Sequence, residues 1–372
     1  MNKTDKHTAY KFIISGGGTG GHIFPAISIA NALKKQYPSA DFLFVGADNR
    51  MEMERVPAAG YAIKGLPVKG FDRKNLLKNI KVLLDLWKSL RMAKNIIRAF
   101  KPDIAIGVGG YASAPVLRAA SAFGIPTLIQ EQNSYAGVTN KLLAKKAACI
   151  CVAYDEMERF FPKDKIVKTG NPVRQDLFEV EAKAQAAYDY FKLKPTYKTI
   201  LIVGGSLGAR TINQSVHKHL QTLIDAGVQV IWQTGRYYIE EADKLRATIQ
   251  SDKLVITTFV SRMDYAYAIA DIVISRAGAS SISELCLLSK PAILVPSPNV
   301  AEDHQTKNAM ALVKRDAAVM VKDVDAVEQL IPMTLGLLND NDKLTTLSQN
   351  IYQLAEKNAA ERIVAEIERI IN

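Results

Sequence analysis

A histidine follows a cluster of glycines near the start of the chain, in the run Gly16–His22. Glycines there let the backbone approach a ligand closely, and the N–H groups that open a helix attract an anion. A histidine beside such a loop is a candidate general base, because imidazole titrates near neutral pH. The alternative is a purely structural His22. The run therefore predicts a phosphate-binding loop with His22 as its catalytic candidate.

The same run also fits the pattern G-x-G-x-x-G, which leaves a dinucleotide site open. That site needs an acidic residue at the end of the second strand to hold a ribose. The second predicted strand ends at Val45–Ala47, with Asp48 only just beyond it. This position disfavours the dinucleotide interpretation without removing it.

Two further loops have the composition of phosphate-binding sites. Gly204–Arg210 contains Ser206, whose hydroxyl and neighbouring N–H groups suit a phosphate, although a tight turn is the alternative. Arg276–Glu284 opens a helix with small residues. Glu284 fits either a capping-box partner of Ser280 or Ser281 or a carboxylate that holds the hydroxyls of a ribose.

Polar residues also follow two predicted strands of the first half, in Gly107–Tyr111 and Glu131–Asn133. Ligands of open parallel sheets bind at the carboxyl ends of the strands. These residues are therefore expected at the rim of a binding site.

No pattern in the sequence favours a metal site. Asp323/Asp325 and Asp340/Asp342 have the Asp-x-Asp spacing, but each pair precedes a predicted helix and N-capping is the better explanation. His217 and His219 point to different sides of a helix. Three cysteines provide neither a disulfide framework nor a zinc motif. We expect no metal and no cofactor.

Short apolar runs alternate with amphipathic segments, which predicts an α/β fold with parallel sheets. The strands are expected at Lys11–Ser15, Phe42–Val45, Ile104–Val108, Thr127–Gln130, Ile150–Val152, Ile166–Thr169, Thr199–Val203, Val228–Gln233, Leu254–Thr257, Ile272–Ser275, Ala292–Val295 and Ala318–Val321.

A strand, a glycine loop and a helix follow one another twice, from Lys11 and again from Thr199. This repeat predicts two doubly wound, Rossmann-like domains that face an inter-domain cleft. We expect the domains to span 1–171 and 172–354, with a final helix over about Leu344–Ile371 whose last part, about 355–372, joins the first domain.

The net charge of +11 favours anionic partners. Eleven Lys or Arg against two Asp fall in the stretch 64–101, where apolar residues from Leu76 to Ile97 follow helical spacing. Such a stretch favours an anionic membrane surface over nucleic acid, for which no recognition motif is present. Neither a signal peptide nor a membrane-spanning run is evident, so we expect a cytoplasmic protein at the membrane face.

Seven motifs occur in an order that resembles the MurG family of undecaprenyl-diphospho-muramoylpentapeptide β-N-acetylglucosaminyltransferases, from about residue 11 to the end. They are Gly-Gly-Thr-Gly-Gly-His-Ile-Phe-Pro (17–25), Gly-Val-Gly-Gly-Tyr (107–111), Glu-Gln-Asn (131–133), Thr-Asn-Lys (139–141), Gly-Asn-Pro-Val-Arg (170–174), Gly-Gly-Ser-x-Gly-Ala-Arg (204–210) and Ser-Arg-x-Gly-Ala (275–279).

The resemblance implies a GT-B fold and a metal-independent, inverting transferase. Its donor would be UDP-N-acetylglucosamine and its acceptor the lipid-linked sugar lipid I, which becomes lipid II in peptidoglycan synthesis, a process on which cell shape and division depend. The first domain would bind the acceptor and the membrane, and the second the donor. The enzyme would be peripheral, at the cytoplasmic face of the cell inner membrane.

Carried over by motif, the resemblance also assigns residues. His22 would take the proton from the C4 hydroxyl of the acceptor. The donor would be bound by Thr19, Gly20, Gly21, Asn133, Arg174, Ser206, Val260, Ala279, Ser280, Ser281, Glu284, Gln305 and Asn308. Within this set Val260 would meet the uracil through its backbone, and Glu284 would hold the ribose. The acceptor side would include Tyr111, Glu131 and Asn140.

Three positions depart from the family pattern. Gln130 stands where a histidine is common, Leu207 where a glutamine often follows the loop serine, and His304 where a pair of glutamines is common. Gln130 removes one acid/base group and adds weight to His22. Three other functions stay open: a GT-B transferase with another lipid acceptor, a dinucleotide-dependent oxidoreductase, and a non-catalytic membrane scaffold.

Overall fold

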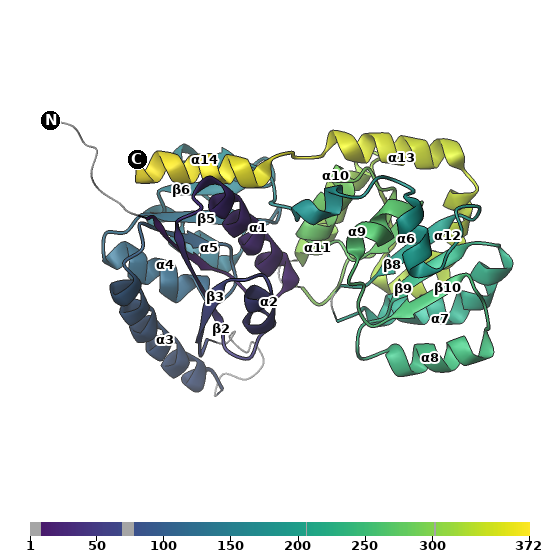
Figure 1. Ribbon diagram of the computed structural model, residues 1–372, viewed down its shortest axis with the longest axis horizontal. Helices are drawn as coiled ribbons and strands as arrows, with labels where there is room; N and C mark the ends of the chain where they lie inside the picture. The colour runs from purple at the N-terminus through teal and green to yellow at the C-terminus, as the bar shows by residue number, and fades with distance from the viewer. Residues whose placement is uncertain (1–8, 69–77, 206, 301–302) are drawn as a thin grey trace. The chain divides into compact units, whose positions relative to one another are not determined.

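The computed structural model describes residues 9–68, 78–205, 207–300 and 303–372 (Figure 1). It divides into two compact units. Unit 1 consists of Met1–Arg174 and Glu356–Asn372, and unit 2 is Gln175–Ala355. Each unit contains one sheet with helices on its faces.

The sheet of unit 1 has seven parallel strands in the order β3-β2-β1-β4-β5-β6-β7. Their bounds are β1 Lys11–Ser15, β2 Asp41–Ala47, β3 Ala62–Leu66, β4 Ile104–Gly107, β5 Thr127–Glu131, β6 Cys149–Val152 and β7 Ile166–Lys168. The central strands are apolar and fully buried, as expected for strands that helices cover on both sides.

Helices cover both faces of this sheet. They are α1 Gly20–Gln36, α2 Glu52–Ala58, α3 Lys78–Phe100, α4 Ser113–Ala122, α5 Val138–Leu143 and α14 Ala359–Ile371, with short 3₁₀ turns at 144–146, 157–159 and 163–165. Alternate residues of β1 point to opposite faces. Ile13 packs with residues of α3 and α4, whereas Phe12 and Ile14 pack with α1 and α14, which lie side by side (Figure 1).

The sheet of unit 2 has six parallel strands in the order β10-β9-β8-β11-β12-β13. Their bounds are β8 Thr199–Val203, β9 Gln229–Gln233, β10 Leu254–Thr257, β11 Ile272–Ser275, β12 Ala292–Leu294 and β13 Val319–Met320. The helices are α6 Gln185–Phe191, α7 Arg210–Asp225, α8 Ile239–Thr248, α9 Met263–Ile269, α10 Ala279–Leu287, α11 His304–Val313, α12 Ala326–Leu338 and α13 Asn341–Gln353, with 3₁₀ turns at 175–178 and 323–325.

The predicted fold class is confirmed: both units are α/β, and every strand pairing is parallel. One strand was missed. β3 lies at the edge of its sheet, alternates exposed and half-buried residues before the buried Leu66, and contains Lys64 and Gly65. It therefore lacks the continuous apolar run of a central strand.

The single final helix expected over Leu344–Ile371 is wrong, because two helices occupy this segment. α13 ends at Gln353, and Asn358 has a left-handed φ of 54° immediately before α14. A residue in the left-handed conformation cannot continue a right-handed helix, so the helix is interrupted there. α13 belongs to unit 2 and α14 to unit 1.

Each sheet changes direction once, at a topological switch point. In unit 1 it lies between β1 and β4, and in unit 2 between β8 and β11. The helices that follow the two strands of such a pair leave on opposite sides of the sheet, which opens a crevice at the carboxyl ends of the strands. The glycine loops that follow these four strands are therefore at the binding edges of their sheets.

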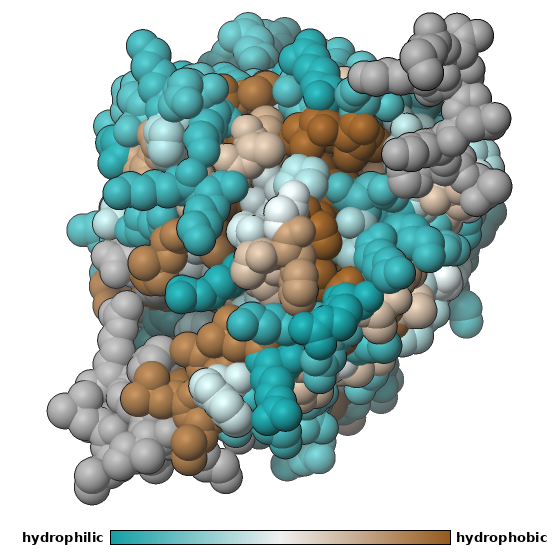
Figure 2. Space-filling model, turned by 90° about the vertical axis from the view of Figure 1, so that its left-hand side faces the viewer, coloured by the Kyte–Doolittle hydropathy of each residue, from teal (hydrophilic) through white to brown (hydrophobic). Residues whose placement is uncertain are grey.

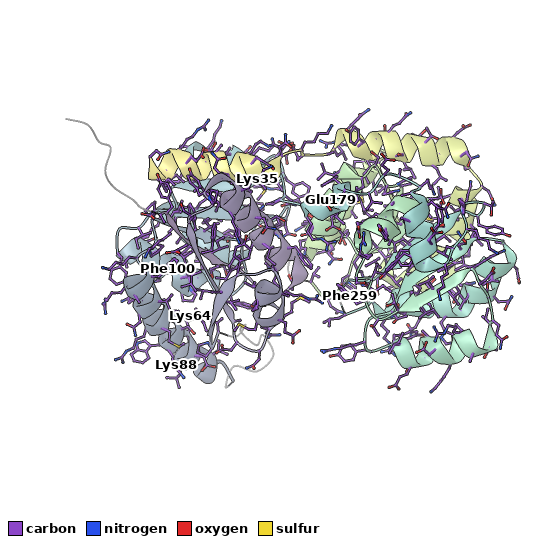
Figure 3. All side chains as sticks on the ribbon, in the orientation of Figure 1. Lys35, Lys64, Lys88, Phe100, Glu179 and Phe259 are labelled. Carbon is purple, nitrogen blue, oxygen red and sulfur yellow. The ribbon has the colours of Figure 1, made fainter. Side chains whose placement is uncertain are left out.

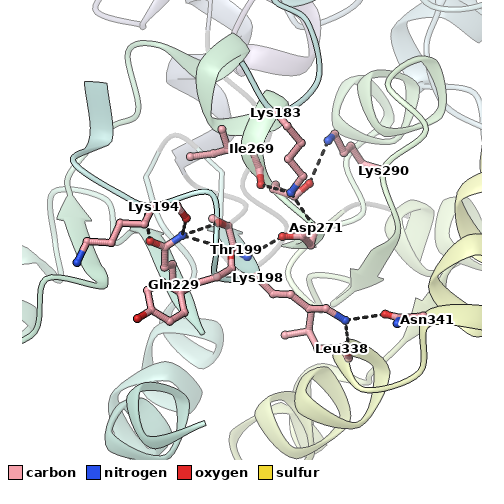
Figure 4. Close-up of polar contacts among 12 residues, drawn as sticks. Lys183, Lys194, Lys198, Thr199, Gln229, Ile269, Asp271, Lys290, Leu338 and Asn341 are labelled. Atoms are coloured by element: carbon pink, nitrogen blue, oxygen red, sulfur yellow. Dashed lines mark hydrogen bonds and ion pairs between the residues drawn. The ribbon is translucent and has the colours of Figure 1, made fainter. Parts of the chain in front are cut away.

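The opposite edge of the unit 2 sheet contains a lysine network (Figure 4). Asp271 accepts the Thr199 N–H at 2.7 Å and thereby links the starts of β8 and β11. Lys183 donates to the other Asp271 oxygen at 2.7 Å, and Lys290 donates to the Ala270 carbonyl at 3.0 Å. Burial and the charge of Lys183 lower the pKa of Lys290 to about 8, and Asp271 offsets part of that effect.

We expect the stability of the wild type relative to Lys290→Met to rise by about 2–3 kcal/mol as the pH increases from 7 to 10. Between pH 8 and 10 Lys290 is increasingly neutral in the folded chain but still protonated in the unfolded one, so the unfolded state binds more protons. Urea unfolding of both proteins at several pH values measures the difference, in which other titrating groups cancel. A difference independent of pH would contradict the shifted pKa.

Candidate functional site

The first glycine loop connects β1 to α1, as the sequence predicts. α1 begins at Gly20, with Thr19 in extended conformation before it. Gly18 and Thr19 are exposed, whereas Gly16 and Gly17 are buried. The loop thus presents its second half and the start of a helix to solvent, the geometry that suits an anion.

His22 lies in the first turn of α1, and its ring folds back onto the loop. The Nδ1 atom is 3.0 Å from the Gly17 carbonyl oxygen and 3.4 Å from the Thr19 hydroxyl. Because a carbonyl oxygen only accepts, Nδ1 carries the proton in that contact, and Nε2 is the nitrogen with the lone pair. This is the tautomer that a general base needs.

A second loop, after β4, packs directly against the first. A Cβ on Gly109 would lie 2.9 Å from His22 Nε2, and a Cβ on Gly110 would overlap the Gly17 carbonyl oxygen. Both glycines have positive φ, 91° and 83°. The close approach of the two loops therefore requires residues without side chains at both positions.

Sequence reasoning missed Glu52, which lies under the first loop. Its side chain is fully buried at the start of α2. One carboxylate oxygen accepts the Ala47 N–H at 2.9 Å, and the other accepts the Gly18 N–H at 3.0 Å. An acidic residue in the first turn of a short helix gives no sequence signal for such a role, because that is an ordinary position for it.

The structure separates the residues predicted for the acceptor side. Tyr111 is 58% exposed, whereas Glu131 and Asn140 are 1% and 2% exposed. The Glu131 carboxylate accepts the N–H groups of Asn133 and Gly137 and the Asn140 amide, at 3.1, 2.9 and 2.8 Å. Glu131 and Asn140 thus hold the loop after β5, and Asn133 is the part-exposed residue of this group.

Gln130 belongs to a buried cluster of amides. It donates to Asn171 Oδ1 at 3.1 Å, Asn171 donates to the Gln132 carbonyl at 3.1 Å, and Gln132 donates to the Val108 carbonyl at 2.8 Å. All three amide side chains are at most 2% exposed. Gln130 therefore joins the loops after β4, β5 and β7 and lies beneath the surface of the site.

Arg174 is the last residue of the first segment of unit 1 and lies beside α1. Its guanidinium lies 5.2 Å from the centre of the Phe24 ring, and Phe24 follows His22 by two residues in α1. A cation over an aromatic face is held by electrostatic attraction. Among the residues predicted to bind the donor, Thr19, Gly20, Gly21, Asn133 and Arg174 thus gather at the binding edge of the unit 1 sheet.

In unit 2 the loop after β8 folds tightly against the loop after β9. Ser206 lies outside the described residues. A Cβ on Gly208, whose φ is 81°, would overlap the Thr234 carbonyl oxygen. Gln233 joins three loops, because it donates to the Gly205 carbonyl at 2.9 Å and accepts the Val260 N–H at 2.8 Å.

The loop after β11 leads into α10, which begins at Ala279 with Ser280 and Ser281 in its first turn. Gly278 is the N-cap residue, so a capping box between Glu284 and Ser280 or Ser281 does not form. Glu284 instead accepts a hydrogen bond from the Tyr267 hydroxyl at 3.0 Å and is only half-buried. The arrangement keeps the carboxylate beside the helix start.

Two residues after β12 that were predicted to bind the donor form hydrogen bonds with neighbouring loops. The Gln305 side chain accepts the Ser297 N–H at 2.8 Å, and the fully buried Asn308 donates to the Ala277 carbonyl at 3.3 Å. His304 is the first residue of α11. Asn308 therefore supports the loop before α10.

N-capping explains one of the two Asp-x-Asp pairs. Asp340 accepts the Lys343 N–H at 2.8 Å and caps α13. Asp323 instead pairs with Arg276, which also donates to two carbonyls after β12. In the part of the chain that the structure describes, no group of His, Cys, Asp and Glu has the arrangement of a metal site.

Two doubly wound units with glycine loops at their switch points define a GT-B protein, the fold class of many nucleotide-sugar glycosyltransferases. The family models of the glycosyltransferase family 28 N-terminal and C-terminal domains match residues 12–152 and 199–363. The chain therefore belongs to glycosyltransferase family 28, in the group that contains the MurG enzymes.

The chain is similar along its whole length to curated enzymes. A UDP-N-acetylglucosamine–N-acetylmuramyl-(pentapeptide) pyrophosphoryl-undecaprenol N-acetylglucosamine transferase of Parabacteroides distasonis is 64% identical over 98% of this chain and 99% of its own. The enzyme of the same name from Porphyromonas gingivalis is 56% identical over 100% and 98%. The crystal structure of Acinetobacter baumannii MurG has a TM-score of 0.73 and 27% identity, covering 97% of this chain and 99% of that one.

We expect Gly208→Ala to lower the free energy of unfolding by more than about 3 kcal/mol, because the new Cβ overlaps backbone. Gly227→Ala is the matched control, since Gly227 has a φ of 76° but open space around it. It should cost only about 1 kcal/mol, from its left-handed backbone alone. Urea unfolding compares the two variants, and equal losses would show that the loop after β8 relaxes without cost.

Proposed function

We propose that this chain transfers N-acetylglucosamine from UDP-N-acetylglucosamine to the C4 hydroxyl of the muramoyl-pentapeptide of lipid I, giving lipid II. The observation that carries the proposal is the identity of 56–64% to enzymes of that name over nearly their whole length. The site agrees with it, because a histidine in the tautomer of a base stands at one glycine loop and helix N-termini follow the others.

Unit 2 provides the donor half. The start of α10, with Ala279, Ser280 and Ser281, suits the diphosphate, and Glu284 beside it suits the ribose hydroxyls. Gln233 already accepts the Val260 N–H, so a contact from the Val260 backbone to uracil would use its carbonyl. Gln305 and Asn308 engage neighbouring loops, and we propose that they shape the pocket for the sugar.

Unit 1 provides the base and the acceptor half. His22 Nε2 removes the proton from the C4 hydroxyl while that oxygen attacks the anomeric carbon from the face opposite UDP, so the configuration inverts. The bond from the anomeric carbon to the phosphate oxygen breaks, and the electron pair leaves with UDP. Helix N–H groups stabilise the new charge on the phosphate, and no metal is required.

Exposure assigns different tasks to the acceptor-side residues. Tyr111 is open to solvent beside Gly110 and is placed to touch the acceptor. The carboxylate of Glu131 is occupied by four N–H donors of its own loop, including both groups of Asn133. We propose that Glu131 and Asn140 act by holding Asn133 in position.

We expect His22→Ala to lower acceptor-dependent UDP release by about 10²-fold in EDTA, because the base is lost. The assay uses UDP-N-acetylglucosamine and a soluble lipid I analogue. His217→Ala, which removes an exposed histidine of α7, is the control and should keep wild-type activity.

Two of the alternative functions, and a transferase with a different base, give different results. No UDP release from the wild type with lipid I, but release with another lipid acceptor, would move the chain to a different GT-B activity. A change in NADH fluorescence on mixing would favour an oxidoreductase. Full activity of His22→Ala would keep the transferase and remove His22 as its base.

We also propose that unit 1 binds an anionic membrane surface through α3. Leu83, Leu84 and Trp87 on this helix are 54%, 64% and 64% exposed, whereas Ile96 and Ile97 near its end are buried. The apolar positions along the helix are thus divided between solvent and core. Leu76, with the other residues 69–77 of the basic stretch, lies outside the described residues.

Cations surround the exposed apolar residues of α3. Lys88, Arg91 and Lys94 are exposed, and the Arg91 guanidinium lies 5.9 Å from the centre of the Trp87 ring. Figure 3 shows Lys88 in the first half of α3 and Phe100 at its end. Figure 2 shows hydrophobic patches bordered by hydrophilic side chains on this end of unit 1. Apolar residues among cations suit an anionic lipid surface.

No helix among the described residues has the length and apolar character needed to cross a membrane. We propose that the association is peripheral. Because apolar side chains and cations both contribute, it requires contact with the lipid interface as well as charge.

We expect Leu84→Ser with Trp87→Ser to lower binding to phosphatidylglycerol/phosphatidylcholine vesicles by at least about 10-fold, since each inserted apolar side chain contributes roughly 1–2 kcal/mol. Val324→Ser, which replaces an 84% exposed residue of unit 2, is the control. Vesicle sedimentation measures both variants. Unchanged binding of the double variant would place the membrane contact elsewhere.

A further inference from the structure

Glu52 and His22 contact opposite ends of one peptide group. The Gly17 carbonyl and the Gly18 N–H belong to the same peptide unit. Glu52 Oε2 accepts the Gly18 N–H at 3.0 Å, and the Gly17 carbonyl oxygen lies 3.0 Å from His22 Nδ1. Two successive hydrogen bonds therefore connect the Glu52 carboxylate, through the Gly17–Gly18 peptide, to the His22 imidazole.

We propose that Glu52 is a positioning residue for the base, acting on His22 through the Gly17–Gly18 peptide. This inference rests on the proposed role of His22. A carboxylate that accepts the N–H of a peptide polarises it, and its carbonyl becomes a stronger acceptor for Nδ1–H. The effect fixes the Nδ1–H tautomer, orients the ring and increases the basicity of Nε2, as a directly bonded carboxylate does for a catalytic histidine.

The burial of Glu52 makes this coupling strong. Its side chain is 0% exposed, so water does not screen the carboxylate from the peptide. Its second oxygen accepts the Ala47 N–H at the end of β2, which anchors the carboxylate to the sheet. A Cβ on Gly17 would overlap the Glu52 carboxylate, so the loop rests directly on it. A buried carboxylate with both oxygens on loop and strand N–H groups is a rigid support.

The peptide is held from its other side as well. A Cβ on Gly110 would overlap the Gly17 carbonyl oxygen, and one on Gly109 would lie 2.8 Å from His22 Cδ2. The loop after β4 thus prevents the Gly17–Gly18 peptide and the imidazole from rotating away. Glu52 and the two glycines act on the same group from different elements of unit 1.

The test compares Glu52→Gln, His22→Ala and the double variant. The Ala47 and Gly18 N–H groups meet different oxygens of Glu52. In Glu52→Gln one of these oxygens becomes an NH₂ donor, so the variant loses one of the two contacts together with the negative charge. We expect kcat for acceptor-dependent UDP release to fall roughly 10- to 100-fold with little change in the donor KM. In the His22→Ala background Glu52→Gln should have no further effect on kcat. Additive losses, or a wild-type rate for Glu52→Gln, would overturn the proposal.

Asp103→Asn is the matched control, because Asp103 accepts the N–H of Lys11 at the other end of β1, at 2.7 Å. It should leave kcat unchanged. Thermal unfolding shows whether each variant is folded. If Glu52→Gln does not fold, Glu52→Asp replaces it, since its shorter arm keeps the charge but not both contacts, and it should lower kcat less severely.

A readout independent of activity is the ¹⁵N spectrum of the His22 ring, assigned by its loss in His22→Ala. The wild type should show the pattern of a ring protonated at Nδ1, and Glu52→Gln should show a mixture of tautomers. An unchanged spectrum would overturn the positioning role of Glu52 even if the transferase activity is confirmed. A wild type without transferase activity would refute the proposed function instead, while the spectra still decide whether Glu52 controls the ring.

Discussion

The site depends on the close approach of two loops at the switch point of a parallel sheet. β1 and β4 are neighbours, and the loops that follow them come so near that Gly110 has no room for a Cβ beside the Gly17 carbonyl. The same constraint recurs in unit 2, where Gly208 meets the carbonyl of Thr234. Glycines in both units thus serve backbone packing as much as ligand access, and a side chain at these points would displace the loops.

The glycines allow the loops to approach one another, and buried polar groups hold the loops in that position. Glu52 has both carboxylate oxygens on N–H groups of two other segments, and Glu131 has both on N–H groups of the loop that follows it. Arg276 with Asp323 ties the loop after β11 to the rest of unit 2. A buried charge is stable only when its hydrogen bonds are satisfied. The loops are therefore held by interactions that are costly to break. The residues that face solvent, such as His22 and Tyr111, are thus attached to rigid loops.

Much of the fold could be predicted from the sequence, because central parallel strands are continuous apolar runs with definite ends. β1, β8, β10 and β11 have the predicted bounds. β3 was missed because an edge strand does not need such a run, and the break before α14 because Asn358 lies in a segment whose amphipathic pattern resumes after it.

The loops of the site could be predicted from the sequence, but the buried residues that hold these loops could not. Motifs locate Gly16–His22 and the start of α10, since spacing around glycine is visible in a sequence. The sequence does not show which residues contact the ligand and which support the loops. Glu131, Asn140 and Asn308 have the same residue types as exposed ligand contacts, and only their burial distinguishes them. Glu52 carries no signal at all, because its partners are backbone N–H groups from two other segments.

The return of the chain to unit 1 has a consequence for biosynthesis. α14 supplies Ile363, Val364 and Ile367 to the apolar layer that also contains Ile23 and Cys149. These residues are translated only after all of unit 2, about 180 residues later. At ordinary elongation rates that interval is roughly 10–40 s. During it the nascent first unit has one apolar face without its helix, so the face is exposed to chaperones and to aggregation until synthesis is nearly complete.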